Sequence, residues 1–169
     1  MATHKGSEGT VKVGSNARGN IVANHIRQQI REYIGTTLTG LTTTGSNVYE
    51  SRVYPLENAK LPALIIYTKS ETSEPIVIGT DRVMSRELSV VVEGYAKATS
   101  DFDDTIDTIS KEVEEAIAAD RTLDGKAKDT YLESTEIEFN GEGEKPLGYV
   151  SLTFITNYYV QETNPDVAV

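Results

Sequence analysis

The sequence predicts an α+β fold: a mixed, mainly antiparallel sheet with two helices packed on one of its faces. Two segments repeat apolar residues at steps of three to five, the spacing of one helix face. Three other segments are rich in valine, isoleucine and tyrosine, which favour strands, and two further strands are predicted near the C-terminus. The expected order is helix, three or four strands, helix, two strands, and this order indicates an α+β sandwich.

The length of 169 residues fits one domain that can bury a core without disulfides or metals. Residues 1–19 are polar and glycine-rich, so we expect a flexible N-terminal arm there. The expected domain covers residues 20–163, and residues 164–169 are expected to be a C-terminal tail.

The first helix is predicted from an apolar stripe that begins after residue 20. Gly35, Gly40 and the threonines between 36 and 44 weaken its end, so the helix is expected to stop before Leu41. The stripe consists of Ile21, Val22, Ile26, Ile30, Ile34 and Leu38.

Strands are predicted at residues 47–54, 63–69 and 83–96. In the third, Leu88, Val90 and Val92 alternate with polar residues, which indicates one core face and one wetter face. Residues 72–81 contain Pro75 and Gly79 and are expected to form a hairpin or a projecting loop.

The second helix is predicted from Ser100, which has Asp103 three positions later, the spacing of a capping box. The turn formers Asp124 and Gly125 close the segment. Its expected core stripe is Phe102, Ile106, Ile109, Val113 and Ile117.

The last two strands are predicted at residues 131–140 and 149–161, as an antiparallel hairpin around the turn at 141–146. Alternation in the final strand predicts which side chains meet the helices. They are Val150, Leu152, Phe154, Tyr158 and Val160.

Composition excludes several classes of protein. The chain has no cysteine, which excludes disulfides, thiolate metal sites and cysteine nucleophiles. Its longest apolar stretch, residues 61–67, is too short to cross a bilayer, and residues 1–19 lack the apolar segment of a secretory signal. A net charge of −10 disfavours tight binding to nucleic acid, although acidity also keeps a protein soluble. We therefore expect synthesis and use inside a cell, with no membrane association.

Residues that could carry catalysis are few. The histidines are His4, in the arm, and His25, which we expect to be a surface residue of the first helix rather than a catalytic base. The carboxylates at 101, 103, 104 and 107 could suggest a magnesium or calcium site, but acidic residues also favour the start of a helix. We prefer the helix interpretation, and expect no enzyme activity, cofactor or metal.

Residues 52–67, RVYPLENAKLPALIIY, resemble the tail terminator (tail completion) proteins of long-tailed phages, the relatives of lambda minor tail protein U. In that family a strand, a short loop and a Leu-Pro-Ala strand occur in the same order. The resemblance extends to the preceding helix, to the acidic helix at 101–119 and to LTFITNY at 152–158. Residues 3–14 instead look like the start of some phage tail tube proteins.

The resemblance implies a non-enzymatic virion protein that forms a hexameric ring on the last ring of the tail tube. Such a ring stops tube polymerisation and presents a surface to the head-completion or connector protein, at the head-proximal end of a tail assembled in the host cytoplasm. A tail tube protein, a neck protein and a small metal-dependent enzyme are the alternatives.

Residues 53–64 and 72–81 are expected to help form contacts with neighbouring subunits, because Pro55 and Pro62 stiffen the first of these segments and its side chains look exposed. Packing of these side chains in the monomer core is the alternative. Strand residues Tyr149, Ile155 and Tyr159 also carry more apolar surface than a solvated face needs. The subunit or tube interface candidates are Arg52, Tyr54, Leu56, Glu57 and Leu61. The candidates for an acidic channel wall, past which DNA moves without specific binding, are Asp101, Asp103, Asp104 and Glu142. A solvated outer surface is the alternative position for these four residues.

Overall fold

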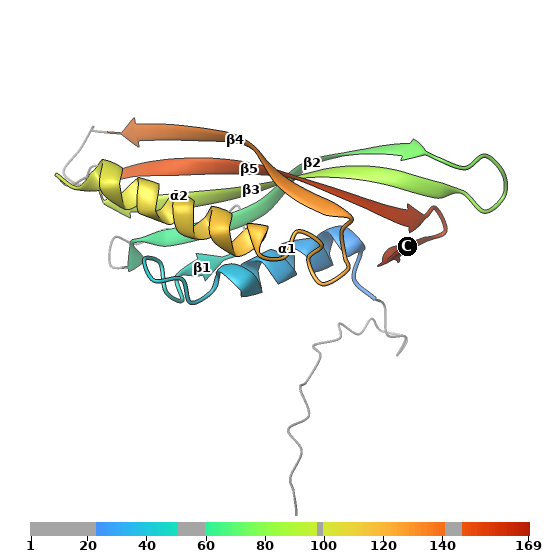
Figure 1. The fold of residues 1–169 in the computed structure, drawn as a ribbon, viewed down its shortest axis with the longest axis horizontal. Helices are drawn as coiled ribbons and strands as arrows, with labels where there is room; N and C mark the ends of the chain where they lie inside the picture. The colour runs from blue at the N-terminus through green and yellow to red at the C-terminus, as the bar shows by residue number, and fades with distance from the viewer. Residues whose placement is uncertain (1–22, 51–59, 98–99, 141–146) are drawn as a thin grey trace, which may run out of the picture.

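The computed structural model describes residues 23–50, 60–97, 100–140 and 147–169. In these residues two helices lie on one face of a six-stranded sheet (Figure 1). The helices are α1 (Ile26–Leu38) and α2 (Phe102–Ala118). The strands are β1 (Val48–Tyr49), β2 (Ala63–Pro75), β3 (Val83–Lys97), β4 (Asp129–Asn140), β5 (Leu147–Gln161) and β6 (Asn164–Ala168). The predicted α+β class is confirmed.

The sheet is mixed and mainly antiparallel, as predicted. Its strand order is β1-β2-β3-β5-β4, and β6 pairs with the end of β5. Only the β1–β2 pair is parallel among the described strands. The centre is the β3–β5 pair, which runs without a register shift from Val83↔Gln161 to Lys97↔Leu147.

The core lies between the helices and one face of β3 and β5. The predicted inward residues of β3 and β5 are buried, and so are the described apolar residues of both helix stripes. The periodicities of strand and helix place each apolar set on one face, and these faces meet in the core. Two glycines allow α2 to lie close to the sheet: a Cβ at Gly94 would come within 2.6 Å of Ile109 Cγ2, and one at Gly148 would overlap the ring of Phe102. Both predicted stripes are confirmed over the described residues.

The beginnings of both helices differ from the sequence predictions. His25 is the N-cap of α1, where its Nδ1 accepts a hydrogen bond from Arg27 N at 3.1 Å, so the prediction of a surface helix residue was wrong. The predicted capping box is not formed, because the N-cap of α2 is Asp101. Ser100 lies one residue too early and donates its hydroxyl to Asp101 Oδ1 instead. The first helix does end before Leu41.

The hairpin of β2 and β3 is longer than predicted. β2 continues six residues past the expected end at 69, to Pro75, because a bulge between Thr68 and Ser70 resets its pairing with β3. The turn lies at residues 76–82, so the hairpin interpretation of 72–81 is confirmed, and the hairpin projects beyond the helices (Figure 1). β1 is shorter than its predicted range, and residues 51–59 lie outside the described part of the chain.

The predicted C-terminal tail at 164–169 is instead part of the sheet. Asn164–Ala168 forms β6, and Val169 N donates to Tyr159 O at 2.9 Å. The carbonyl of Asp166 also accepts a hydrogen bond from Gln29 Nε2 of α1 at 2.8 Å. The segment is held in place by these hydrogen bonds with β5 and α1. The local sequence pattern of residues 164–169 does not predict them.

The turn after α2 is organised by Asp120. Its carboxylate accepts hydrogen bonds from the amide and hydroxyl of Thr122, from Asp124 N and from the Tyr33 hydroxyl. Three consecutive residues, Leu123, Asp124 and Gly125, have positive φ, which confirms the turn predicted there. The hydrogen bonds from Thr122, Asp124 and Tyr33 lower the pKa of Asp120 from 3.8 to about 2.

Replacing Asp120 with asparagine is expected to destabilise the fold at neutral pH, and this difference should shrink in acid. A carboxyl whose pKa is depressed by folding contributes stability above its unfolded pKa of 3.8 and loses that contribution as the pH falls towards about 2. Urea unfolding of wild type and variant across this range measures the difference. Tyr33→Phe, which removes one of the bonds, should give a smaller loss, and a pH-independent Asp120→Asn effect would contradict the assignment.

Candidate functional site

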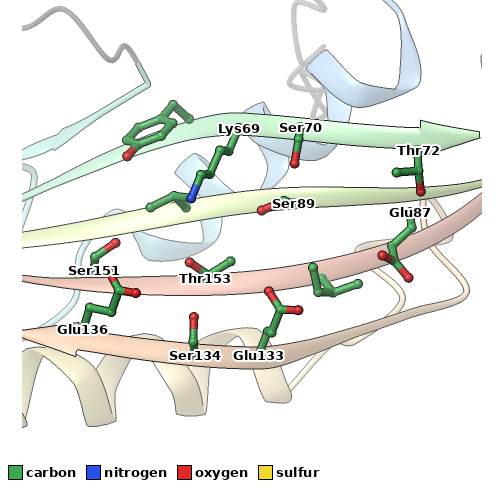
Figure 2. A pocket seen from close by; sticks show the side chains of 13 residues that line it. Lys69, Ser70, Thr72, Glu87, Ser89, Glu133, Ser134, Glu136, Ser151 and Thr153 are labelled. Carbon is green, nitrogen blue, oxygen red and sulfur yellow. The ribbon is translucent and has the colours of Figure 1, made fainter.

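The sheet face opposite the helices is mostly polar, with Val91 and Ile155 among the residues that line its depression, and is called the open face below. Because strand side chains alternate, the residues between the core positions of β3 and β5 point away from the helices. β2 and β4 extend this face on either side. A depression with a volume of about 310 Å³ lies across these four strands. Figure 2 shows the side chains that line it. Its polar side chains are Lys69, Ser70, Thr72, Glu87, Ser89, Glu133, Ser134, Glu136, Ser151 and Thr153.

The open face is acidic where it is hollowed. Glu87, Glu133 and Glu136 surround the depression, and Lys69 is the one basic residue among those that line it. The remaining polar groups are hydroxyls. No histidine lies among the lining residues, so the hydroxyls have no imidazole base to activate them. The arrangement can donate and accept hydrogen bonds and repels anions.

Tyrosines bound to carboxylates form one end of the open face. Glu93 accepts hydrogen bonds from the hydroxyls of Tyr67 at 2.6 Å and Tyr95 at 2.8 Å. Tyr95 stacks on Tyr149, with ring centroids 5.1 Å apart. Burial and the Glu93 hydrogen bond raise the pKa of Tyr95, and the Glu138 hydrogen bond with partial burial raises the pKa of Tyr149 to about 12. These phenols are therefore neutral donors at physiological pH.

A charged cluster joins α1 to the hairpin on the other side of the sheet. Glu71 accepts hydrogen bonds from Arg86 at 2.7 Å, Arg27 at 3.2 Å and the Tyr158 hydroxyl at 2.5 Å. His25 lies 3.5 Å from Arg86, and burial together with the charge of Arg27 lowers its pKa. Sequence reasoning missed this cluster because the bulge before Ser70 reverses the phase of β2 and turns Glu71 inward.

Exposed apolar side chains gather at the tip of the hairpin. Ile76, Val77 and Ile78, between the two strands, are 55%, 47% and 97% exposed, whereas the valines, leucines and isoleucines of β2 and β3 are buried or half-buried. By contrast, the strand residues expected to be apolar and exposed are largely covered: Ile155 is 5% exposed and Tyr149 stacks on Tyr95. The exposed apolar surface of the described strands and turns thus lies at the tip, on β4 and at the C-terminus rather than on β5.

Most of the predicted interface candidates fall outside the described residues. These are Arg52, Tyr54, Leu56 and Glu57, together with the channel candidate Glu142. Leu61 is half-buried and precedes β2 at a cis peptide bond to Pro62.

The other channel candidates lie at the start of α2. Asp101, Asp103 and Asp104 are exposed there, in the helix layer and not on the open face. Acidic side chains in this first turn favour the positive end of the helix dipole. Within the described residues, no group of three or more histidine, aspartate or glutamate side chains could hold a metal ion.

Comparisons with known proteins find similarity among solved structures. No family model matches the sequence, and no curated protein matches it. Among solved structures, the chain is similar to a chain of the virion of a native gene transfer agent particle, with a TM-score of 0.36 and 13% identity. The similarity covers 79% of this chain and 90% of that chain. A TM-score this low supports no argument about function.

Proposed function

We propose that this protein is a structural component of a phage-type particle: a tail terminator whose ring of six subunits caps the tail tube. The support is the sequence resemblance of residues 52–67 and of the segments around them. Within the described residues, the elements of that resemblance are present in order: helix α1, the Leu-Pro-Ala strand β2, the acidic helix α2 and the closing strand β5. The ring would end tube growth and offer a joining surface to the head-completion or connector protein.

The observation that carries the proposal is the acidic, hydroxyl-lined open face, which neither helix covers. DNA leaving a particle must pass its channel wall without adhering to it, and phosphates adhere through lysine and arginine. We propose that the open face, with Glu87, Glu133 and Glu136, lines the channel. The first turn of α2, proposed from the sequence, lies in the helix layer on the opposite side of the sheet, so it is the alternative wall.

Geometry is the proposed mechanism. A tube grows by repeating one head-to-tail interface, so a subunit that offers one half of that interface ends the polymer. The partners are thus further copies of this chain, the tail tube protein and a connector protein. No helix in the described residues is long and apolar enough to cross a membrane.

The ring is tested by electron microscopy and native mass spectrometry of the purified protein, alone and with isolated tail tubes. We expect six-fold rings on tube ends, and charge reversals at Arg52 and Glu57 should impair them while leaving the circular dichroism spectrum unchanged. Attachment to portal rings instead would favour a neck protein. Stacking of the protein into long tubes would favour a tube protein, which the likeness of residues 3–14 to tube proteins keeps as the second candidate.

The acidic wall is tested with DNA. Wild-type protein should show no salt-resistant complex with duplex DNA in a gel-shift assay, because carboxylates repel phosphates. In particles, a variant with Glu87, Glu133 and Glu136 changed to lysine should slow DNA ejection. The matched control changes Asp103, Asp104 and Asp107 to lysine, with the same shift in net charge on the helix layer. If only the control variant slowed DNA ejection, the first turn of α2 and not the open face would line the channel.

A further inference from the structure

β4 is a long edge strand. Among the described strands it pairs only with β5, from Asp129↔Asn157 to Asn140↔Leu147. Its other edge therefore presents backbone donors and acceptors along a strand of 12 residues. Protein edges of this kind are usually short, covered by another segment or protected by lysine. β4 contains no lysine, and it has one bulge, between Leu132 and Ser134. Its charged side chains are all acidic, so they repel an acidic strand and attract a basic one.

The two sides of β4 differ in chemistry. On the helix side, Ile137 and Phe139 are 55% and 62% exposed, and Phe139 touches Phe102 edge-on with ring centroids 5.7 Å apart. A hollow of about 450 Å³ lies between Ile137 and α2. On the open-face side, Glu136 and Glu138 pair opposite Ser151 and Tyr149 of β5. An added strand would meet apolar groups on one side and carboxylates on the other.

The chain itself contains a segment of that chemistry, outside the described residues. Residues 1–22 carry Lys5, Lys12 and Arg18 against Glu8, so this segment is basic although the whole chain has a net charge of −10. In Val11-Lys12-Val13 the two valines would face one side of a strand and the lysine the other. Fully extended, 22 residues reach roughly 70 Å, and a strand the length of β4 needs roughly 40 Å.

We propose that residues 1–22 of this chain add as a strand to the free edge of β4. Val11 and Val13 lie on the side of Ile137 and Phe139, and Lys12 lies on the side of Glu136 and Glu138. Main-chain hydrogen bonds supply the affinity, and the alternating side chains set the register. This inference is independent of the proposed ring, because it concerns an edge that a single chain or a pair of chains can complete.

The apolar hairpin tip of a second copy is the rival occupant, and charge disfavours it. Glu74, Asp81 and Arg82 flank the tip, whereas the hollow beside β4 is lined by three carboxylates and one lysine. These are Asp107, Glu114, Glu115 and Lys111. Carboxylates outnumber the basic groups on both of these surfaces, so bringing them together would be repulsive. Lys12 is instead attracted by Glu136 and Glu138 on the other side of β4.

Disulfide trapping tests the contact cleanly, because the chain has no cysteine of its own. Full-length Val13→Cys is combined in turn with Thr135→Cys, Ile137→Cys or Phe139→Cys on β4. Mild oxidation should cross-link at least one of these pairs, within one chain or between two, since a disulfide needs Cβ atoms about 4 Å apart. The control pair joins Val13→Cys to Thr72→Cys, an exposed site on the open face of β2. Cross-linking no faster on β4 than in the control would overturn the proposal.

Hydrogen exchange of residues 129–140 gives a second measurement that needs no new cysteine. A paired edge is protected, so Lys12→Glu should accelerate exchange of outward β4 amides about tenfold. Lys97→Glu, an exposed residue with the same charge change, should leave it unaltered. Unchanged exchange in Lys12→Glu, or equal acceleration in both variants, would overturn the proposal whatever the assembly state of the protein.

Discussion

Glu71→Ala is expected to lower the free energy of unfolding by about 3–5 kcal/mol, the range seen when one partner of a buried ion pair is removed. The Glu71 side chain is 8% exposed and that of Arg86 is 17% exposed, so the arginine loses its partner in a site that water hardly reaches. The Tyr158 hydroxyl loses its acceptor as well. Arg27, at 43% exposure, can turn to solvent and adds little to the loss.

Urea unfolding of the full chain measures this change, with Glu74→Ala as the matched control. Glu74 is on the same strand and is exposed, so its substitution should change stability by no more than about 0.5 kcal/mol. Tyr158→Phe removes one hydrogen bond of the cluster and should fall between the two. A Glu71→Ala variant as stable as Glu74→Ala would show that the cluster does not hold the hairpin to α1.

Replacing Ile76 and Ile78 together with serine is expected to abolish assembly while leaving the monomer folded. The two side chains are 55% and 97% exposed, so the monomer gains little from them. If they are buried against a neighbouring subunit or the tube, each contributes about 1.5–3 kcal/mol to that contact. Losing both should weaken association by roughly a hundredfold or more per contact.

Electron microscopy of tails assembled with the variant, alongside thermal unfolding of the free protein, checks this expectation. The control is Val167→Ser, which removes a 50% exposed apolar side chain from β6 and should leave assembly normal. Capped tails of normal length from the double variant would contradict a role for the tip. Loss of assembly in both variants would point to a general effect of lost apolar surface.

Local periodicity determined most of the elements from the sequence alone. The stripe from Phe102 to Ile117 and the alternation of β5 predicted α2, β5 and their buried faces, because a core of helices on a sheet needs those spacings whatever the neighbours are. The strand ends and helix starts were less accurate, since Ser100 and Asp101 are both good capping residues and only the three-dimensional chain path selects one. No described residue tests the interface candidates at 52–57.

Tertiary structure alone decided which polar residues come together. The bulge after Thr68 turns Glu71 towards Arg86, and the pairing of β6 with β5 converts an expected tail into sheet. Both depend on register between strands far apart in sequence, where a shift of one residue exchanges the two faces. The same non-local pairing leaves β4 at an edge and gathers glutamates and hydroxyls from four strands on the open face. Residue type and spacing do not predict this strand pairing, because the free energy that favours it comes from contacts between elements.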